Sequence, residues 1–324
     1  MLSFRATYQW HQLDARMFKI WNLAAHGFAC GLVWLLGSCL SFSSSEHVAS
    51  SLLFAAHPIH SEAVANVMGR AEMLCLIACL LSLACYRRAV VASSLAPRVG
   101  FLLLSLVLWL TATLCKETGA LFLALLALED LFSCWCSNRS PVSPTARLRD
   151  IAVRWLSLLV SGVSYLVTRL WLCDWQLGPE MDVWDNPTAF SPQPTKALSI
   201  ANIHARYAWL AVWPSHLSAD WSGGAIPLVE GFGDARLLGP LGTYTAILAA
   251  VALGCRMLRM NQARPGGRGE AALRCTAWGF VSFLPASNVL FPVGTVIGER
   301  LLYAPYRYNP NPNPNWRLLY APSL

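Results

Sequence analysis

The sequence has 324 residues, of which 56% are apolar and only 13% are charged, and its mean hydropathy is +0.46. A soluble globular domain usually carries about twice this charged fraction, while 14 Trp and 13 Phe exclude a disordered or low-complexity chain. The net charge of +7 lies in short connecting segments, without the basic, aromatic-rich stripe typical of nucleic-acid binding. The composition therefore predicts an integral membrane protein with no nucleic-acid partner.

Long apolar blocks predict an all-α fold, a polytopic transmembrane helical bundle. Residues 1–19 are polar, aromatic and basic, which indicates an interfacial segment rather than a signal peptide. A weaker apolar block covers 197–214. We expect about eight spans, roughly at 20–40, 48–66, 72–86, 99–115, 118–134, 151–172, 237–257 and 274–297.

Three connecting loops are distinctly basic, and the positive-inside rule places all three in the cytosol. A full crossing at 197–214 would move the third loop to the other side, so we expect a re-entrant or interfacial helix there, anchored by Trp209 and Trp213. The long stretch 173–236 then belongs to the non-cytosolic face. The loops carry Arg87, Arg88 and Arg98; Arg139, Arg147 and Arg149; and Arg256, Arg259, Arg264, Arg268 and Arg274.

Ionisable side chains gather at the span ends on the non-cytosolic face, where by default they mark a substrate path or a paired site. Lys116 and Glu117 are sequence neighbours, as are Glu299 and Arg300, and a structural ion pair is one interpretation of each. His26 lies alone inside the first span, and we expect a hydrogen-bonded core histidine.

The segment from His57 to Glu62 follows an apolar run, and its Pro58 suits the first turn of a helix. Packing or capping, metal binding, and contact with an anionic lipid-linked donor are the three interpretations. His57 and His60 are three positions apart, whereas helical zinc pairs prefer four, and no third ligand is evident. We therefore expect no metal site.

Two other segments have the chemistry of an anion or sugar site. Gly69 permits a tight turn or a close backbone approach, and Arg70 beside it offers a planar fork for phosphate, or is simply a surface residue of that turn. The loops 174–190 and 220–228 share Asp, Trp, Gly and Pro, a composition that also occurs in sugar-binding loops.

A set of short motifs, taken together, resembles the transmembrane and TPR-repeat-containing (TMTC) family. The motifs follow the family's order from near residue 1 to about residue 305. They are residues 53–64 (LFAAHPIHSEAV), 69–72 (GRAE), 115–119 (CKETG), 185–190 (DNPTAF), 219–222 (ADWS), 226–230 (IPLVE), 284–288 (LPASN) and 296–303 (VIGERLLY).

The resemblance implies a multi-pass endoplasmic-reticulum membrane enzyme of the GT-C glycosyltransferase class. Such an enzyme transfers mannose from dolichyl-phosphate mannose to Ser or Thr hydroxyls of luminal proteins, so its partners are the membrane lipid, the lipid-linked sugar and an acceptor protein. The chemistry needs a carboxylate base for the hydroxyl and cations for the departing lipid phosphate. Because that phosphate is already a good leaving group, the resemblance implies no metal and no cofactor.

The resemblance also assigns candidate residues. It places the catalytic base in an acidic pair upstream of Met1, so we assign no catalytic residue and expect this chain alone to be inactive. We expect the donor phosphate to be bound by His57, His60, Arg70, Lys116 and Arg300. We expect the carboxylates that orient them to be Glu62, Glu72, Glu117 and Glu299, and the sugar or acceptor site to contain Asp185, Asp220 and Trp221.

The expected organisation has five parts: the end of a first luminal loop, N-terminal transmembrane helices, a luminal region with the re-entrant helix, C-terminal transmembrane helices, and an aberrant or low-complexity tail without TPR repeats. Their ranges are 1–19, 20–172, 173–236, 237–305 and 306–324. Arg300–Pro305 recurs as Arg317–Pro322 around an Asn-Pro run that cannot form a membrane helix, which indicates a duplicated junction or a genuine luminal loop. The alternatives to an enzyme are a non-catalytic membrane scaffold and a transporter or flippase, although no inverted repeat is evident.

Overall fold

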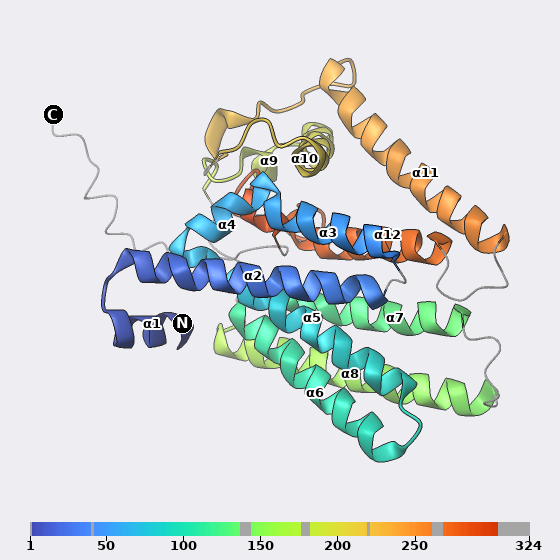
Figure 1. Ribbon diagram of the computed structural model, residues 1–324. Coiled ribbons are helices and arrows are strands. Elements are labelled where there is room, and N and C mark those ends of the chain that lie inside the picture. The colour runs from blue at the N-terminus through green and yellow to red at the C-terminus, as the bar shows by residue number, and fades with distance from the viewer. Residues whose placement is uncertain are drawn as a thin grey trace.

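The computed structural model describes residues 2–39, 42–136, 144–175, 182–218, 221–260 and 268–303. Within these ranges the chain is helical and contains no β-strand, which confirms the predicted all-α class (Figure 1). The α-helices are α1 (Leu2–His11), α2 (Ala15–Cys39), α3 (Ser44–Ala56), α4 (Ser61–Ala65), α5 (Arg70–Val91), α6 (Leu95–Cys115), α7 (Phe122–Cys136), α8 (Pro144–Leu172), α9 (Pro187–Phe190), α10 (Thr195–Val212), α11 (Leu238–Met260) and α12 (Arg268–Phe283). Short 3₁₀ turns are η1 (Pro58–His60), η2 (Val67–Gly69), η3 (Glu117–Leu121), η4 (Gly223–Ala225), η5 (Ala235–Leu237), η6 (Leu284–Ala286) and η7 (Glu299–Leu302). The expected tail 306–324 and its repeat lie outside the described residues.

Five segments of the described chain are long and apolar enough to cross a membrane. The other three expected blocks form shorter helices: α3 has 13 residues, α7 has 15 and α12 has 16. At 1.5 Å per residue these helices are about 20–24 Å long, less than the roughly 30 Å of a hydrocarbon core. The five segments are Ala15–Gly37, Val67–Val91, Leu95–Cys115, Leu148–Leu172 and Ala235–Met260.

The block expected at 48–66 is broken in its middle. His57 is extended, because the residue before a proline is disfavoured in the helical region, and Pro58 then starts the turn η1. The His57 ring accepts a hydrogen bond from the Ile59 amide at 3.3 Å and so caps that turn. After α4 the chain turns back at Gly69, where an added Cβ would meet the Ala63 carbonyl oxygen at 1.8 Å. The close backbone approach predicted for this glycine is therefore found.

The long helices form a bundle in which the helix ends that flank the three basic loops lie together. In Figure 1 the helices α2, α5, α6, α7 and α8 run in the same general direction across the view. The C-terminal ends of α5, α7 and α11 and the N-terminal ends of α6, α8 and α12 all lie at its right-hand end, next to the three basic loops of the sequence. This common placement agrees with the topology expected from the positive-inside rule. The opposite end carries α1 and the turns η2 and η3.

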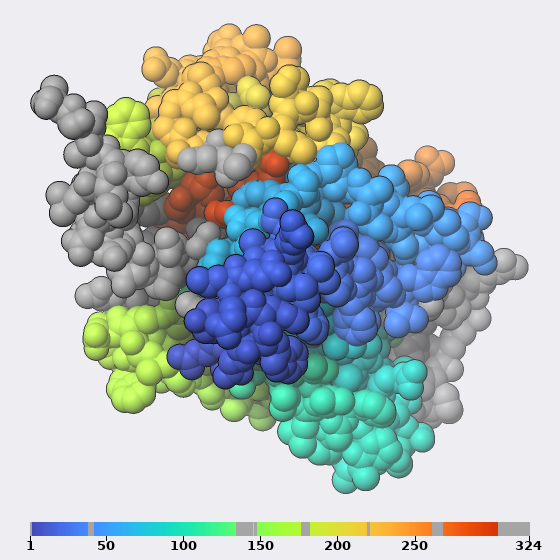
Figure 2. Space-filling view, turned by 60° about the vertical axis from the view of Figure 1, so that its left-hand side comes forward, coloured from blue at the N-terminus to red at the C-terminus, as the bar shows by residue number. Residues whose placement is uncertain are grey.

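A second layer is built from α9, α10 and the segment 284–303. Figure 1 shows α10 nearly end-on, so it runs across the direction of the bundle, and Figure 2 shows α10 in yellow and the segment 284–303 in red-orange beside the blue N-terminal helices. Its hydrophobic core joins distant parts of the sequence. The buried residues are Ile59, Ile203, Tyr207, Leu210, Ile226, Ala286, Val293, Val296, Ile297 and Leu301.

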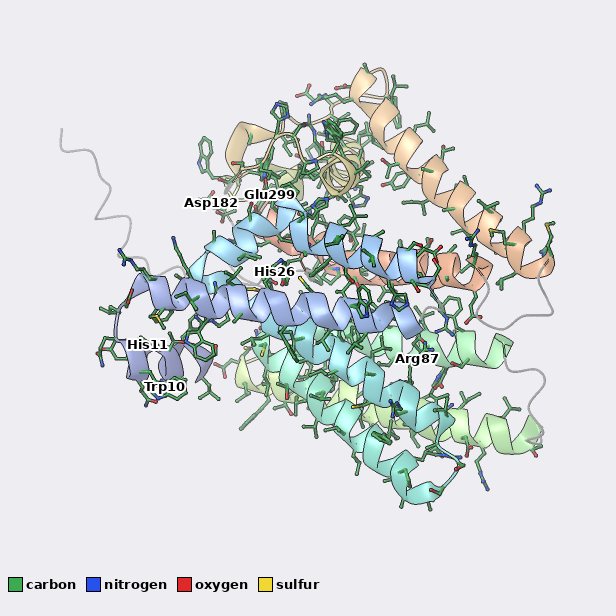
Figure 3. All side chains as sticks on the ribbon, in the orientation of Figure 1. Trp10, His11, His26, Arg87, Asp182 and Glu299 are labelled. Carbon is green, nitrogen blue, oxygen red and sulfur yellow. The ribbon has the colours of Figure 1, made fainter. Side chains whose placement is uncertain are left out.

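A buried cluster of charges joins four helices near the basic end. Glu129 and Asp130 on α7 are each only 1% exposed. Glu129 accepts hydrogen bonds from Arg87 at 2.7 Å, from Arg274, and from the Trp278 indole at 3.2 Å. Asp130 accepts hydrogen bonds from the Tyr86 hydroxyl at 2.7 Å and from Arg154 at 3.0 Å. Figure 3 places Arg87 toward this end of the bundle. The cluster therefore ties α5, α8 and α12 to α7.

Candidate active site

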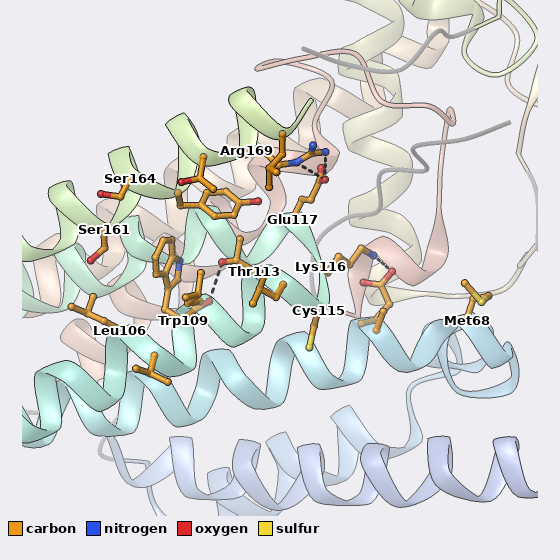
Figure 4. Close-up of a pocket in the computed structure, with 18 of the residues that line it drawn as sticks. Met68, Leu106, Trp109, Thr113, Cys115, Lys116, Glu117, Ser161, Ser164 and Arg169 are labelled. Carbon is orange, nitrogen blue, oxygen red and sulfur yellow. Dashed lines mark hydrogen bonds and ion pairs between the residues drawn. The ribbon is translucent and has the colours of Figure 1, made fainter. Parts of the chain in front are cut away.

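An apolar groove of about 930 Å³ runs between α6 and α8 toward the end of the bundle that carries η3 (Figure 4). It follows α6 from Leu103 to Cys115, about 18 Å of helix at 1.5 Å per residue. The α6 wall is aliphatic for most of this length. It consists of Leu103, Leu106, Val107, Leu110 and Leu114.

The facing wall on α8 is more polar. Ser161, Ser164, Tyr165, Thr168 and Arg169 all line the groove, and their spacing of three and four residues places them on one helical face. In Figure 4 Ser161 and Ser164 lie along this helix and Arg169 lies near its end. The groove thus has one aliphatic wall, one hydroxyl-bearing wall and a charged end, which we call the mouth.

The first ion pair of the mouth joins Lys116 to Glu72, and it is buried. The two side chains are 6% and 3% exposed, and the Lys116 ammonium contacts Glu72 Oε1. Helix α6 ends at Cys115, and Lys116 follows in an extended conformation. Side chains that follow one another in extended backbone point to opposite sides, so Lys116 reaches α5 while Glu117 faces α8.

The second ion pair joins Glu117, at the start of η3, to Arg169 on α8. Arg169 Nε donates to Glu117 Oε1 at 3.0 Å, and Arg169 Nη2 donates to the same oxygen. This pair is much more exposed than the first, with side-chain exposures of 29% for Arg169 and 42% for Glu117. Figure 4 shows the two side chains meeting at the end of α8.

The third ion pair joins Arg300 to Glu62. Arg300 Nη1 donates to Glu62 Oε1 at 2.8 Å, and the Arg300 backbone amide donates to Glu62 Oε2 at 2.8 Å. Glu62 is 9% exposed and Arg300 is 24% exposed. Both oxygens of Glu62 are therefore held, and this pair fixes η7 against α4.

Glu299 has a different partner set from its neighbour Arg300. Its carboxylate is 2% exposed and accepts hydrogen bonds from the Ser218 amide and, at 3.2 Å, from the Trp221 indole N–H. Burial raises the pKa of Glu299, against a smaller lowering effect of these two donors. Glu299 therefore anchors the loop that carries Trp221 rather than facing the groove mouth.

Arg70, a predicted phosphate ligand, is directed away from the groove. Its guanidinium is buried between the rings of Phe4 and Phe18, at 4.9 and 5.5 Å from their centroids. It donates to Asn22 Oδ1, Thr7 Oγ1 and the backbone oxygens of Ser3 and Phe18 at 2.7–3.2 Å. This geometry does not fit the predicted role, because the fork binds α1 and α2 instead. A charged residue at the end of an apolar block is compatible with phosphate binding and with a structural role, and only the tertiary structure distinguishes the two.

The two predicted histidine ligands also lie outside the groove. His57 shares a hydrogen bond of 3.1 Å with the Ala211 carbonyl. His60 is 6% exposed and packs against the rings of Phe54 and Tyr303 at 4.5 and 4.8 Å. Burial, with smaller effects of neighbouring histidines, lowers the pKa of His60 to about 3, so its ring is neutral near pH 7. A neutral buried ring fits the packing interpretation better than phosphate binding.

His26 belongs to the same aromatic group. One ring nitrogen shares a hydrogen bond of 2.8 Å with the Tyr303 hydroxyl, and the other lies 3.2 Å from the Ala55 carbonyl. It is thus the hydrogen-bonded core histidine expected from the sequence. In the part of the chain that the structure describes, no three His, Cys, Asp or Glu residues converge in a geometry that could hold a metal ion.

The two loops with sugar-site composition lie together. The Gly223 amide donates to the Trp184 carbonyl oxygen at 2.6 Å, which joins the loop of Asp185 to the loop of Trp221. Asp185 is exposed, and its carboxylate accepts from the Asp182 amide at 3.1 Å. Asp220 lies outside the described residues. The sugar or acceptor role of these residues stays a prediction.

Sequence comparison adds evidence that is independent of the groove. The family model described as protein O-mannosyl-transferase TMTC, DUF1736, matches residues 177–248, which include α9, α10 and the start of α11. Protein O-mannosyl-transferase TMTC3 of Mus musculus is 32% identical over 94% of this chain. The resemblance to the TMTC family is confirmed. Tmtc3 of Drosophila melanogaster is 31% identical and TMTC3 of Homo sapiens is 32% identical, each again over 94% of this chain.

The match covers only part of the relatives. This chain spans 33% of the mouse protein, 37% of the fly protein and 34% of the human protein, or about a third of their length. No solved structure matches. The groove helices α6 and α8 lie outside the segment that the TMTC family model matches, but within the chain shared with these relatives.

Sequence reasoning missed the α8 wall, including Arg169. The signal was available, because Ser161, Ser164, Thr168 and Arg169 recur at helical spacing within an otherwise apolar block. Polar residues on one face of a span mark a pathway or a site.

Proposed function

We propose that this chain forms the membrane part of a protein O-mannosyl-transferase that uses dolichyl-phosphate mannose as donor and Ser or Thr of luminal proteins as acceptor. The observation that carries the proposal is the groove, which joins an aliphatic channel at membrane depth to a mouth with three cations. The relatives are named protein O-mannosyl-transferases, and this supplies the reaction.

The two ends of such a donor have opposite requirements. A polyprenyl chain gains about 25 cal/mol for each Å² of apolar surface that it buries away from water, whereas its phosphate needs charge-assisted hydrogen bonds. The aliphatic α6 wall meets the first requirement. Lys116, Arg169 and Arg300 at the mouth meet the second. The sugar would then lie beyond the phosphate, on the side of η3 and the luminal loops.

The mouth also fits the chemistry of the transfer. As the bond from the sugar to the phosphate breaks, negative charge grows on the leaving phosphate, and preorganised cations lower the barrier for that step. Their paired carboxylates hold the cations in place before the donor arrives. We propose an endoplasmic-reticulum location and a GT-C type of mechanism on the basis of the family resemblance. The general base is not assigned to a residue of this chain.

A chimera tests the proposal without depending on the length of this chain. Residues 1–303 replace the matching segment of mouse TMTC3, and mannosyl transfer from labelled dolichyl-phosphate mannose to an acceptor protein is measured in membranes. We expect transfer by the chimera and a loss of at least about ten-fold with Arg300→Gln, since a hydrogen bond to a charged group contributes about 1.5–3 kcal/mol. Arg98→Gln, at the other end of the bundle, is the matched control. A folded chimera without transfer, or one indifferent to Arg300, would contradict the proposal.

A further inference from the structure

We propose that Glu117 occupies the place of the donor phosphate before the donor binds, and that the lipid phosphodiester displaces its carboxylate from Arg169. This inference rests on the proposed function and adds the exchange of one anion for another at Arg169. It assigns Arg169 as the cation that takes the incoming phosphate and Glu117 as its internal competitor.

The charges of the mouth make an exchange necessary. The three cations are each joined to a carboxylate, as Lys116 to Glu72, Arg169 to Glu117 and Arg300 to Glu62. These six side chains together carry no net charge. An incoming phosphodiester brings one negative charge into a largely apolar groove, where an uncompensated charge is costly. At least one carboxylate must therefore give up its cation when the donor binds.

Burial shows which carboxylate can do so. Glu72 is 3% exposed and Glu62 is 9% exposed, whereas Glu117 is 42% exposed. A carboxylate released from either buried pair would lose its counter-ion inside the protein, which is strongly destabilising. Glu117 already faces water and can be hydrated as soon as it leaves Arg169. Glu62 is in addition bound by two groups of Arg300, its amide and its guanidinium.

The position of Arg169 fits the entry of a lipid. Arg169 lies on the groove face of α8, one turn beyond Tyr165, and Glu117 lies on η3, directly after the last residues of the α6 wall. The pair therefore bridges the two walls at the mouth (Figure 4). The Nε and Nη2 groups of Arg169 both donate to the same oxygen of Glu117, while Nη1 contacts Cys173 Sγ. A phosphodiester with two free oxygens can accept both arms of the guanidinium fork, so the fork geometry favours the exchange.

The exchange has a consequence for the reaction. When the phosphodiester binds Arg169, the Glu117 carboxylate is released next to the site where the sugar must lie. Binding of the donor is thus coupled to the appearance of an unpaired carboxylate on the luminal side of the phosphate. Without a donor, the same carboxylate keeps Arg169 neutralised and the mouth closed by an ion pair.

Equilibrium binding of citronellyl phosphoryl mannose, a short-chain phosphodiester, to the purified full chain in nanodiscs tests the exchange. Glu117→Gln removes the competitor, and because partly exposed ion pairs contribute about 0.2–1 kcal/mol, we expect about 1.4- to five-fold tighter binding. Arg169→Gln is expected to weaken binding about ten-fold or more, and Arg169→Lys to fall between it and the wild type. In the double variant Glu117→Gln/Arg169→Gln, the gain from Glu117→Gln should disappear.

The control is the ion pair Arg98–Asp150 at the opposite end of the bundle. Its side chains are also partly exposed, Arg98 by 29% and Asp150 by 28%. Asp150→Asn should leave the affinity unchanged. Equal affinity of Glu117→Gln and wild type would overturn the exchange while leaving the proposed function standing. Absence of binding to the folded wild-type chain would overturn both. Inorganic phosphate that competes as strongly as the phosphodiester would overturn the assignment of a lipid-linked ligand.

Discussion

The charged cluster on α7 makes a quantitative prediction about stability. Glu129→Gln keeps the size of the side chain but removes its charge. Glu129 is 1% exposed and faces Arg87, Arg274 and the Trp278 indole. The substitution therefore leaves guanidinium charge without its carboxylate inside the bundle.

The magnitude follows from the burial of the two arginines. Breaking a buried ion pair costs about 3–5 kcal/mol when one partner stays charged. Arg274 is 4% exposed but keeps Glu270 at 2.8 Å, and Arg87 is 29% exposed and can turn toward water. Both features place the cost near the lower limit, about 3 kcal/mol. For a chain of this size, with an unfolding entropy of about 2.1 cal/mol/K per residue, that corresponds to roughly 4 °C in Tm.

Thermal unfolding in one detergent, followed by fluorescence-detected size-exclusion chromatography, measures this change. Asp150→Asn is the control, because its pair with Arg98 is partly exposed and contributes about 0–1 kcal/mol. We expect the Tm of Glu129→Gln to fall well below that of the control. Equal values for the two variants would refute the reasoning that this cluster fixes α7 to its neighbours.

Three further predictions follow from the groove and its surroundings. Leu106→Trp places a larger side chain in the groove beside the aliphatic wall and should weaken binding of a long-chain polyprenyl phosphate more than binding of a short-chain one. The ratio of the two Kd values measures this difference. An equal effect on both ligands would contradict the assignment of this wall to the lipid chain. Because the pKa of His60 is lowered, the unfolded chain binds a proton below about pH 6.5 that the folded chain does not. The free energy of unfolding is therefore highest above that pH and falls by about 1.4 kcal/mol per pH unit toward pH 3. His60→Phe should flatten this part of the Tm–pH curve, and an unchanged slope would exclude His60 as its source. Thr7→Val removes the hydroxyl that accepts a hydrogen bond from Arg70. It should speed proteolysis within α1 by about ten-fold or more, since a hydrogen bond to a charged group contributes about 1.5–3 kcal/mol, while an unchanged rate would exclude this clamp.

The sequence was sufficient for features that depend on local pattern. Five of the eight expected apolar blocks correspond to helices long enough to span a membrane, and clustered arginines predicted which helix ends lie together. The block at 48–66 was predicted as one span because its composition is apolar, yet His57 and Pro58 end α3 there. In that case backbone chemistry overrode hydropathy.

The candidate site was predicted only in part, because ion-pair partners are chosen by the tertiary structure. Ion pairs between the sequence neighbours Lys116–Glu117 and Glu299–Arg300 were one interpretation of the sequence, but Lys116 contacts Glu72 and Arg300 contacts Glu62. Arg169 contacts Glu117, 52 positions away, and no local pattern specifies such a contact. Its helical spacing with the α8 hydroxyls was the one sequence signal of its position.

The segment 284–303 shows the same limit on a larger scale. Its Leu-Pro-Ala-Ser-Asn and Gly-Glu-Arg motifs were recognised as part of the family resemblance, but their structural roles were not. In the fold, Val293, Val296 and Ile297 form the core beneath α10, while Glu299 and Arg300 anchor two different elements. Motif matching identifies such residues, and only their contacts separate packing from chemistry.

The most direct test of the groove is photo-crosslinking with a polyprenyl phosphoryl mannose that carries a diazirine in its first isoprene units, followed by peptide mapping. The account predicts labelling of α6 between residues 103 and 115 and of α8 between residues 160 and 172, with loss of the label when unlabelled dolichyl-phosphate mannose is added. Labelling that resists this competition, or that maps to the outer faces of α2 or α11, would contradict the assignment of the groove as the donor site.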